Sequence, residues 1–455
     1  MVHCIYMAKA KVRYECSACG AIHSSWSGKC STCGEWNTIQ QQLDVASANI
    51  SKGGRSLQAS KISEVAKKSA DVKRISSQDS QLDTVLGGGF VPGSVLLLAG
   101  QPGIGKSTIL MQIAGAVSTK VSVLYISGEE SAHQVASRAT RLKAVNDDLK
   151  LASSTSADDI AKTILEDGYD VVIVDSIQTL NVEAIASAAG TVSQITNSTQ
   201  LLTKAAKQSN TVLILVGHVT KEGSIAGPKV LEHSVDTVLQ FEGDRYGGFK
   251  VLRSVKNRYG STNEAAIYEM EQDGLKPVLN PSAALLAERQ VVDGSIVLAT
   301  MEGTRPVLVE IQALVNKTSY GYPKRAASGF DLNRLNLLIA MLERRTKLVL
   351  NDKDIYINVV GGIAVNEPAS DLAIAMAIGS ATKGLQLKQN AVVFGELGLS
   401  GEIRHVAHID KRVAEAKKLG FEAAIGPNPK SKTKVPMLSS VPDIRTALNN
   451  FLEKE

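Results

Sequence analysis

Aromatic residues, cysteines and long apolar runs are all scarce in this chain of 455 residues. No apolar run approaches the ~20 residues that a membrane span requires, which excludes a transmembrane helix. Residues Met1 to Tyr6 lack the apolar core and the cleavage site of a signal peptide. We therefore expect a cytoplasmic protein without a membrane partner, starting at Met1 or at Met7.

The formal net charge is also small, at +5. Such a charge permits nucleic-acid binding without arguing for it, because binding of that kind needs local basic patches. The chain is too long for one compact core and long enough for two or three domains. Its composition is otherwise that of an ordinary soluble globular protein.

Four of the five cysteines are clustered in two C-x-x-C pairs, each followed by a glycine. Thiolates on two such turns can complete a tetrahedral Zn²⁺ site. Disulfides are the alternative, and the reducing cytoplasm disfavours them. We expect a structural zinc module over residues 11–36, with Trp26 and Trp36 packed into it rather than stacked on bases. The expected zinc ligands are Cys16, Cys19, Cys30 and Cys33.

The stretch from Gly100 to Ser107 fits the phosphate-binding loop pattern, two glycines flanking four residues and then Lys-Ser. Backbone N–H groups of such a loop close on phosphate, and the following helix adds a favourable dipole. We expect Lys106 to reach the β- and γ-phosphates of ATP and Ser107 to ligate Mg²⁺. An ordinary glycine turn is the alternative. The residues expected to contact the nucleotide are Gly100, Gln101, Pro102, Gly103, Ile104, Gly105, Lys106, Ser107 and Thr108.

Three other apolar runs end in polar residues that suit an ATPase. Asp175 is expected to hold Mg²⁺ through water, the alternative being a helix cap. Glu129, with Glu130 in reserve, is expected to activate the attacking water, unless both merely begin a helix whose dipole favours acids. His218 is expected to contact the γ-phosphate, and a structural histidine is the alternative.

A basic pair, Lys256 and Arg258, follows a later apolar run. Two cations separated by one residue on an extended segment point to the same side. They could reach the γ-phosphate bound to a neighbouring subunit, as arginine fingers do, or hold a DNA phosphate. A solvated basic turn is the alternative. The motif consists of Lys256, Asn257, Arg258, Tyr259 and Gly260.

Composition and periodicity divide the rest of the chain. Residues 37–77 are polar and are interpreted as a linker. Residues 78–280 alternate buried strands with helical stretches, which is typical of a doubly wound parallel sheet, here an ATPase core. Residues 281–455 predict a separate mixed α/β domain, with its core at about 354–455 and its last helix beginning near Asp410. The fold class is therefore α/β. The strands expected in the ATPase core are Val95–Ala99, Val121–Ile126, Val171–Val174, Val212–Val216, Val251–Val255 and Ala266–Glu269.

These motifs together resemble the RadA (Sms) family, bacterial DNA-repair ATPases of the RecA superfamily, over essentially the whole chain. The most specific element is Lys256–Gly260, which resembles the KNRFG signature of that family with Tyr259 in place of phenylalanine. The other elements are the zinc cysteines, the phosphate loop and the segments Leu86–Gly89, Tyr125–Ser131 and Gly217–Gly223.

The resemblance implies a DNA-dependent ATPase that processes recombination intermediates and promotes branch migration in double-strand break repair. It implies Lys106 and Glu129 as catalytic residues, with Lys256 and Arg258 coupling DNA to hydrolysis. The implied cofactors are ATP, Mg²⁺ and Zn²⁺. The implied partners are single-stranded and branched DNA, further copies of the chain in a hexameric ring, and the RecA recombinase filament.

The C-terminal third resembles the Lon protease domain, through Asn358–Gly362 and Gly395–Gly401. Proteolysis there needs a serine nucleophile and a lysine that activates it. Ala369 stands at the nucleophile position, and Ser370, one residue later on a helix, points about 100° away. The lysine position falls at Asp410, next to Lys411. We therefore expect a scaffold for oligomerisation and DNA binding rather than a protease. The basic residues that could contact phosphates, or form a solvated face, are Lys383, Arg404, Lys411, Arg412, Lys417 and Lys418.

Three other functions compete with a recombination motor. A hexameric replicative-type helicase shares the core but usually carries a different N-terminal domain. An ATP-dependent Lon-like protease is disfavoured by the missing dyad. A non-catalytic zinc adaptor is disfavoured by the complete set of nucleotide motifs.

Overall fold

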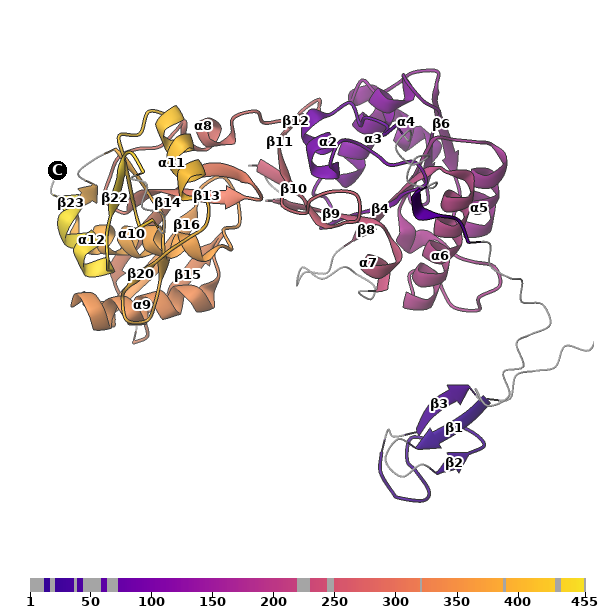
Figure 1. Cartoon of the computed structure of the whole chain (residues 1–455), viewed down its shortest axis with the longest axis horizontal. Helices are drawn as coiled ribbons and strands as arrows, with labels where there is room; N and C mark the ends of the chain where they lie inside the picture. The colour runs from indigo at the N-terminus through magenta and orange to yellow at the C-terminus, as the bar shows by residue number, and fades with distance from the viewer. Residues whose placement is uncertain are drawn as a thin grey trace, which may run out of the picture. The chain divides into compact units, whose positions relative to one another are not determined.

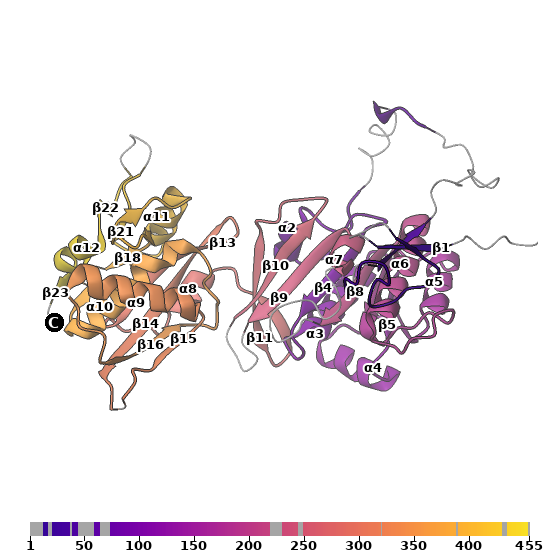
Figure 2. The same cartoon turned by 90° about the horizontal axis from the view of Figure 1, so that it is seen from below.

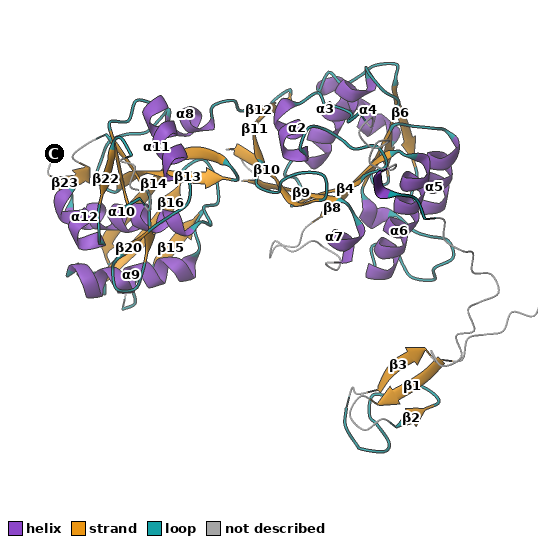
Figure 3. Ribbon diagram, in the orientation of Figure 1, coloured by secondary structure: helices purple, strands orange, loops and turns teal. Residues whose placement is uncertain are grey.

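The computed structural model describes residues 12–16, 21–36, 39–43, 59–63, 73–218, 230–243, 249–319, 321–387, 390–429 and 435–453. Its helices and strands are drawn in Figures 1 and 3. The chain divides into two compact units, residues 1–71 and 72–455, which are treated separately below. No helix within the described ranges is long and apolar enough to cross a membrane.

The first unit contains a three-stranded antiparallel sheet with the order β2-β1-β3. The strands are β1 (Val12–Cys16), β2 (Ile22–His23) and β3 (Ile39–Leu43). Cys30 is buried, and Tyr14 and Ala21 pack against it. The prediction that both tryptophans pack inside this module is wrong, because Trp26 is 61% and Trp36 68% exposed.

The second unit begins with a nine-stranded sheet of order β12-β11-β10-β9-β4-β8-β7-β5-β6. The six strands from β9 to β6 in this order are parallel, and β10, β11 and β12 are antiparallel. Figure 2 shows β10, β9, β4, β8 and β5 following one another across the sheet. The strand bounds are β4 Val95–Gly100, β5 Val123–Ser127, β6 Leu149–Ser153, β7 Val171–Asp175, β8 Val212–His218, β9 Thr237–Gly243, β10 Phe249–Asn257, β11 Ala265–Glu271 and β12 Gly274–Pro277.

Helices cover both faces of this sheet, as the near-continuous apolar strands predict. On one face lie α2 (Ser80–Leu86), α3 (Lys106–Ser118) and α4 (Ala132–Arg141). On the other lie α5 (Ala157–Glu166), α6 (Val192–Ser209) and α7 (Val230–Ser234). Each face has its own apolar core, so the strands are buried on both sides and the predicted doubly wound fold is confirmed.

A second, seven-stranded sheet has the order β15-β16-β14-β13-β18-β21-β22. Figure 1 shows α8 and α11 on one side of β13 and β14, and α9, α10 and α12 on the other. The strands are β13 Ser295–Glu302, β14 Arg305–Lys317, β15 Arg325–Ser328, β16 Lys353–Val359, β18 Ala391–Val393, β21 Ala423–Gly426 and β22 Leu438–Ser440. The helices are α8 Pro281–Leu286, α9 Leu332–Thr346, α10 Asp371–Lys383, α11 Ile409–Lys418 and α12 Ile444–Asn450.

The helix predicted to begin near Asp410 is α11, but it is not the last one. Helix α12 follows it, capped by Asp443, whose side chain accepts a hydrogen bond from the Thr446 N–H. Two short antiparallel ladders complete this part of the chain. They pair β17 (Gln386–Leu387) with β23 (Leu452–Glu453) and β19 (Glu396–Leu397) with β20 (Ile403–Arg404).

Candidate functional site

The phosphate-loop motif joins the end of β4 to the start of α3. Gly103 and Gly105 have positive φ angles of 79° and 115°, which favour glycine. A Cβ on Gly100 would lie 2.7 Å from the Phe241 carbonyl oxygen, and one on Gly105 would lie 2.8 Å from Met270 Cε. The backbone path therefore accounts for all three glycines of the motif.

Lys106 is buried at the first position of α3, 5% exposed. Its ammonium donates to the carbonyl oxygens of Gly100 (2.9 Å) and Gln101 (3.0 Å). Burial lowers the pKa of Lys106 to about 8, although the carboxylates of Asp175 and Glu129 oppose this shift. A cation with this pKa next to loop N–H groups suits the binding of a polyphosphate.

The polar residues expected at the strand ends come together beside this lysine. Strand register pairs Gly100 with His218 across β4 and β8. The Lys106 ammonium lies 3.2 Å from His218 Nδ1, and His218 Nε2 lies 3.7 Å from Glu129 Oε1. Lys106, His218 and Glu129 therefore form a contiguous polar cluster at the carboxyl edge of the sheet.

Two residues that the motif search did not single out support this cluster. The Ser176 hydroxyl donates to the Glu129 carboxylate. The Tyr125 hydroxyl donates to Asp175 Oδ2 at 2.7 Å, and burial and the Asp175 charge raise the pKa of Tyr125. The only sequence signal for Tyr125 is a hydroxyl in an otherwise apolar buried strand.

The two adjacent glutamates have different environments. Glu129 contacts Ser176 and His218, whereas Glu130 accepts a hydrogen bond from Arg138 Nη2 at 2.5 Å. The Glu130 N–H is also held, by the hydroxyl of Ser127. Glu129 is thus the acid that faces the lysine, and Glu130 braces the turn before α4.

The basic motif at residues 256–260 is bound to the main chain and to a buried acid. The Lys256 ammonium donates to the Glu232 and Val235 carbonyl oxygens, at 2.6 and 2.7 Å. Arg258 Nη1 lies 2.9 Å from Asp236 Oδ1. The same oxygen accepts a hydrogen bond from Lys207 Nζ at 3.3 Å. Asp236 is 2% exposed and was not predicted from the sequence.

The motif also packs against the glycine-rich turn at residues 86–89. The Asn257 amide donates to the Leu86 carbonyl oxygen at 3.3 Å, and a Cβ on Gly260 would lie 3.2 Å from Gly87 Cα. Arg74 Nη2 donates to the Tyr259 carbonyl oxygen at 2.8 Å. Residues 86–89 and 256–260, which are distant in the sequence, therefore pack against each other.

This basic motif lies at the edge of the sheet opposite the phosphate loop. Asn257 pairs with Thr237 and Thr237 with Leu96, four residues before Gly100 on β4. Four residues of strand span about 13 Å. Lys256 and Arg258 therefore do not join the polar cluster of their own subunit.

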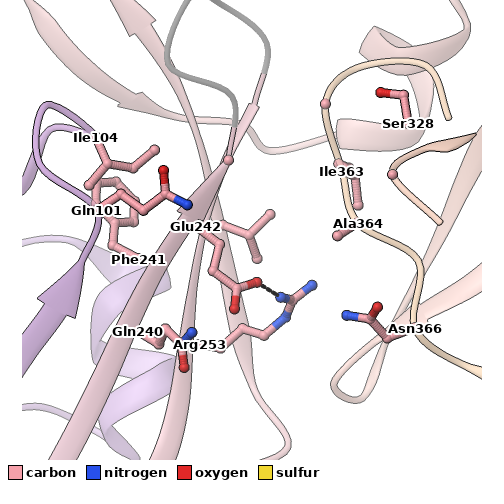
Figure 4. Close-up of a pocket in the computed structure, with 14 residues that line it drawn as sticks. Gln101, Ile104, Gln240, Phe241, Glu242, Arg253, Ser328, Ile363, Ala364 and Asn366 are labelled. Atoms are coloured by element: carbon pink, nitrogen blue, oxygen red, sulfur yellow. Dashed lines mark hydrogen bonds and ion pairs between the residues drawn. The ribbon is translucent and has the colours of Figure 1, made fainter. Parts of the chain in front are cut away.

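A cavity of about 390 Å³ lies between the phosphate loop, strands β9 and β10, and the C-terminal part of the second unit (Figure 4). Gln101 and Ile104 of the loop line it, as does Asn366 from the C-terminal part of the second unit. Arg253 on β10 crosses it and pairs with Glu242 on β9. The same guanidinium donates through Nε to Glu302 Oε2, at the end of β13, at 3.0 Å.

The predicted zinc site is described only in part. Cys19 and the side chain of Cys16 lie outside the described residues. Backbone hydrogen bonding by the Cys33 N–H, opposed by desolvation, lowers the pKa of the Cys30 thiol to about 5. His23 Nε2 lies 3.4 Å from Cys30 Sγ. No group of three metal-binding side chains occurs in the described part of the chain, but a thiolate of low pKa fits a zinc ligand.

The residues at the protease-like positions do not form a dyad. Ser370 is fully buried, and its hydroxyl donates to the Glu367 carbonyl oxygen at 2.7 Å. Lys411 Nζ instead donates to the Thr304 carbonyl oxygen, at 3.2 Å. Arg412 was expected to contact phosphates or to lie on a solvated face, but it is 1% exposed, so that prediction is wrong. Its guanidinium forms a bidentate pair with Glu367, at 2.8 and 2.7 Å, inside the core.

Comparison with known proteins gives three family models and several full-length relatives. The models are the AAA domain at residues 61–224, subunit ChlI of Mg-chelatase at 337–430, and the rubredoxin metal binding domain at 14–41. The chain is 47% identical to the DNA repair protein RadA of Pseudomonas aeruginosa, covering 92% of this chain and 94% of the relative. The chain belongs to the RadA family. It is 45% identical to RadA of Listeria monocytogenes, over 97% of this chain and 98% of the relative.

RadA of Bacillus subtilis is 47% identical, over 92% of this chain and 93% of that protein. The resemblance stated from the motifs is confirmed, as is the combination of a zinc ribbon, an ATPase core and a C-terminal α/β domain. An AAA domain in a RadA-family chain implies ATP and Mg²⁺ as ligands. The rubredoxin-like match supports Zn²⁺.

Proposed function

We propose that this chain is a DNA-dependent ATPase of DNA repair that processes recombination intermediates and drives branch migration. The observation that carries the proposal is the polar cluster of Lys106, Glu129 and His218, with Asp175 on the neighbouring strand. The proposal includes a role in DNA repair because the relatives of this chain are named DNA repair protein RadA.

In this proposal the phosphate loop holds the triphosphate. The Lys106 ammonium exchanges its two loop carbonyls for β- and γ-phosphate oxygens. Ser107, and Asp175 through water, would hold Mg²⁺, which would neutralise charge on the phosphates. The hydroxyl of Tyr125 fixes the Asp175 carboxylate, so the acid is oriented before the nucleotide binds.

Glu129 acts as the general base that removes a proton from the attacking water. Its carboxylate is oriented by the Ser176 hydroxyl and lies close to His218. His218 can exchange this contact for one with the γ-phosphate. The acid would thereby be freed when ATP arrives, which gives the site a means of sensing the nucleotide.

Lys256 and Arg258 complete the site of a neighbouring subunit rather than their own. Both residues lie at the edge of the sheet opposite the phosphate loop, about 13 Å along β4 from Gly100. This distance argues against their contact with the nucleotide of their own subunit. A ring of subunits, six in this proposal, would bring this edge to the next phosphate loop. Hydrolysis at each seam would then move bound single-stranded or branched DNA, and the RecA filament would be a partner on that DNA.

The C-terminal part serves as a scaffold for assembly and DNA binding, not as a protease. A buried Ser370 and a Lys411 directed to a main-chain carbonyl argue against peptide hydrolysis. Arg412, next to Lys411, pairs with Glu367, two residues before Ala369, inside the core. The proposed compartment is the cytoplasm.

Steady-state ATP hydrolysis by the purified protein, with and without single-stranded and forked DNA, tests the proposal. We expect stimulation by DNA and loss of hydrolysis in Lys106→Ala with the fold retained. Ser370→Ala should leave ATP hydrolysis unchanged and casein intact with ATP present. A rate of ATP hydrolysis that does not change when DNA is added, or that persists in Lys106→Ala, would refute the proposal of a DNA-dependent ATPase.

A further inference from the structure

Two indole rings stand in solvent on the zinc module. Trp26 is 61% and Trp36 68% exposed. Trp36 pairs with Lys29 in an isolated antiparallel bridge, and the Lys29 ammonium lies 5.6 Å from the centre of the Trp36 ring. Gly28 lies alongside, where a Cβ would be 3.8 Å from Trp36 Cζ3. Exposed indoles leave apolar surface in water next to a cation, which makes this face a candidate binding surface.

The surroundings of these rings narrow the class of ligand. Ser24, Ser25 and Ser27 flank Trp26, and all three are exposed. Lys29, whose ammonium lies over the Trp36 ring, is also exposed, so a cation accompanies the rings. The core of a protein interface is usually rich in apolar side chains, whereas a single strand needs flat rings for its bases and a cation for its phosphates.

We propose that Trp26, Lys29 and Trp36 form a stacking site for unpaired bases of single-stranded DNA. The proposal rests on the DNA-dependent function proposed above and adds a binding element outside the ATPase core. The indole faces stack on bases, and the Lys29 ammonium, beside the Trp36 ring, is complementary to a phosphate of the same strand. Glu35 is also exposed beside Trp36, so stacking rather than net charge supplies most of the affinity.

The chain contains only two tryptophans, so its intrinsic indole fluorescence reports on these positions alone. The test titrates the full-length, zinc-loaded protein with oligo(dT) and with an oligonucleotide of equal length that carries abasic sites. The anisotropy of labelled oligonucleotide measures total binding. We expect oligo(dT) to quench the emission and the abasic strand to quench it far less, because it retains phosphates but lacks rings.

Variants test each ring separately. Trp26→Ala and Trp36→Ala should each weaken oligo(dT) binding roughly tenfold, and the corresponding Phe variants should recover part of it, because a smaller ring still stacks. Zinc content, measured with a chromogenic chelator, confirms that each variant keeps the module folded. A variant that loses zinc is replaced in the comparison by its Phe counterpart.

The outcomes separate this proposal from the function it rests on. Oligonucleotide that binds by anisotropy without changing the indole emission overturns the stacking site and leaves the DNA-dependent motor intact. Equal quenching by the abasic strand also overturns it. Indoles that stay open to acrylamide at saturating DNA would assign this face to a protein partner instead. No binding at all by anisotropy would count against the proposed function itself.

Discussion

Arg253 and Glu302 join the nine-stranded sheet to the seven-stranded sheet, with 3.0 Å between Arg253 Nε and Glu302 Oε2. The Glu302 side chain is 5% exposed and that of Arg253 is 25% exposed. Burial raises the pKa of Glu302 and the Arg253 charge opposes the shift. The same guanidinium pairs with Glu242 on β9, whose neighbour Phe241 is paired in register with Gly100 of the phosphate loop. This ion pair therefore links the C-terminal part, through β9, to the strand that ends at the phosphate loop.

We predict that Arg253→Ala destabilises the second unit by roughly 3 kcal/mol, the lower end for a broken buried pair, because Arg253 remains partly solvated. The Arg404–Glu402 pair is a matched control, since its side chains are 57% and 39% exposed. Arg404→Ala should cost less than about 1 kcal/mol. Thermal unfolding of both variants measures the difference. Equal melting temperatures for the two variants would show that the buried pair is not a structural link.

The pH dependence of the Arg253 variant has a definite sign. Without the guanidinium, the pKa of the buried Glu302 rises further above its unfolded value. The folded state then binds more protons than the unfolded state, so acid stabilises the variant relative to neutral pH. The stability gap between Arg253→Ala and the wild type should therefore narrow as the pH falls.

The adjacent glutamates give a sharper test of the catalytic site. Glu129→Gln should lower hydrolysis by about 10²–10⁴-fold, the typical contribution of a general base, while ATP binding is retained. Glu130→Gln is the matched control, because Glu130 is engaged by Arg138 and does not face Lys106. Its turnover should stay within a few fold of wild type. Single-turnover hydrolysis and binding of a fluorescent ATP analogue separate chemistry from affinity. If Glu130→Gln lowered the rate of hydrolysis more than Glu129→Gln, Glu130 would be the general base.

Apolar runs predicted six of the nine strands of the ATPase core, because strands buried on both faces are apolar at nearly every position, whereas β6, β9 and β12 were not predicted. The Val95–Gly100 strand and its loop are an example. The sequence did not predict which side chains from distant parts of the chain contact the residues of the motifs. Tyr125 on β5 and Asp236, which directly precedes β9, contact residues of the motifs only because of the order of strands in the sheet. The exposure of side chains in the small zinc module was also predicted wrongly, because both tryptophans were expected to pack inside it and both are exposed.

Action across a subunit seam can be tested by mixing two inactive variants. Lys106→Ala keeps the basic motif, and Arg258→Ala keeps the phosphate loop. In mixed rings about a quarter of the seams would combine the intact halves, so the mixture should regain DNA-stimulated hydrolysis. Lys207→Ala is the control for fold, because it removes another partner of Asp236 outside the motif. It should hydrolyse ATP as the wild type does. If the mixture hydrolysed ATP no faster than either variant alone, Arg258 would not act on the nucleotide site of a neighbouring subunit.

Lys106 makes ATP binding depend on pH near 8. Burial lowers its pKa in the free protein to about 8, from 10.5, and bound phosphates favour the ammonium, so binding takes up a proton above this pH. By linkage, affinity falls as the pH rises through 8, up to tenfold per unit. Calorimetry with a non-hydrolysable ATP analogue, in buffers of different ionisation enthalpy, should detect about half a proton taken up at pH 8. Lys106→Arg should bind without uptake, because a guanidinium stays protonated. Proton uptake of the same size in that variant would show that another group titrates.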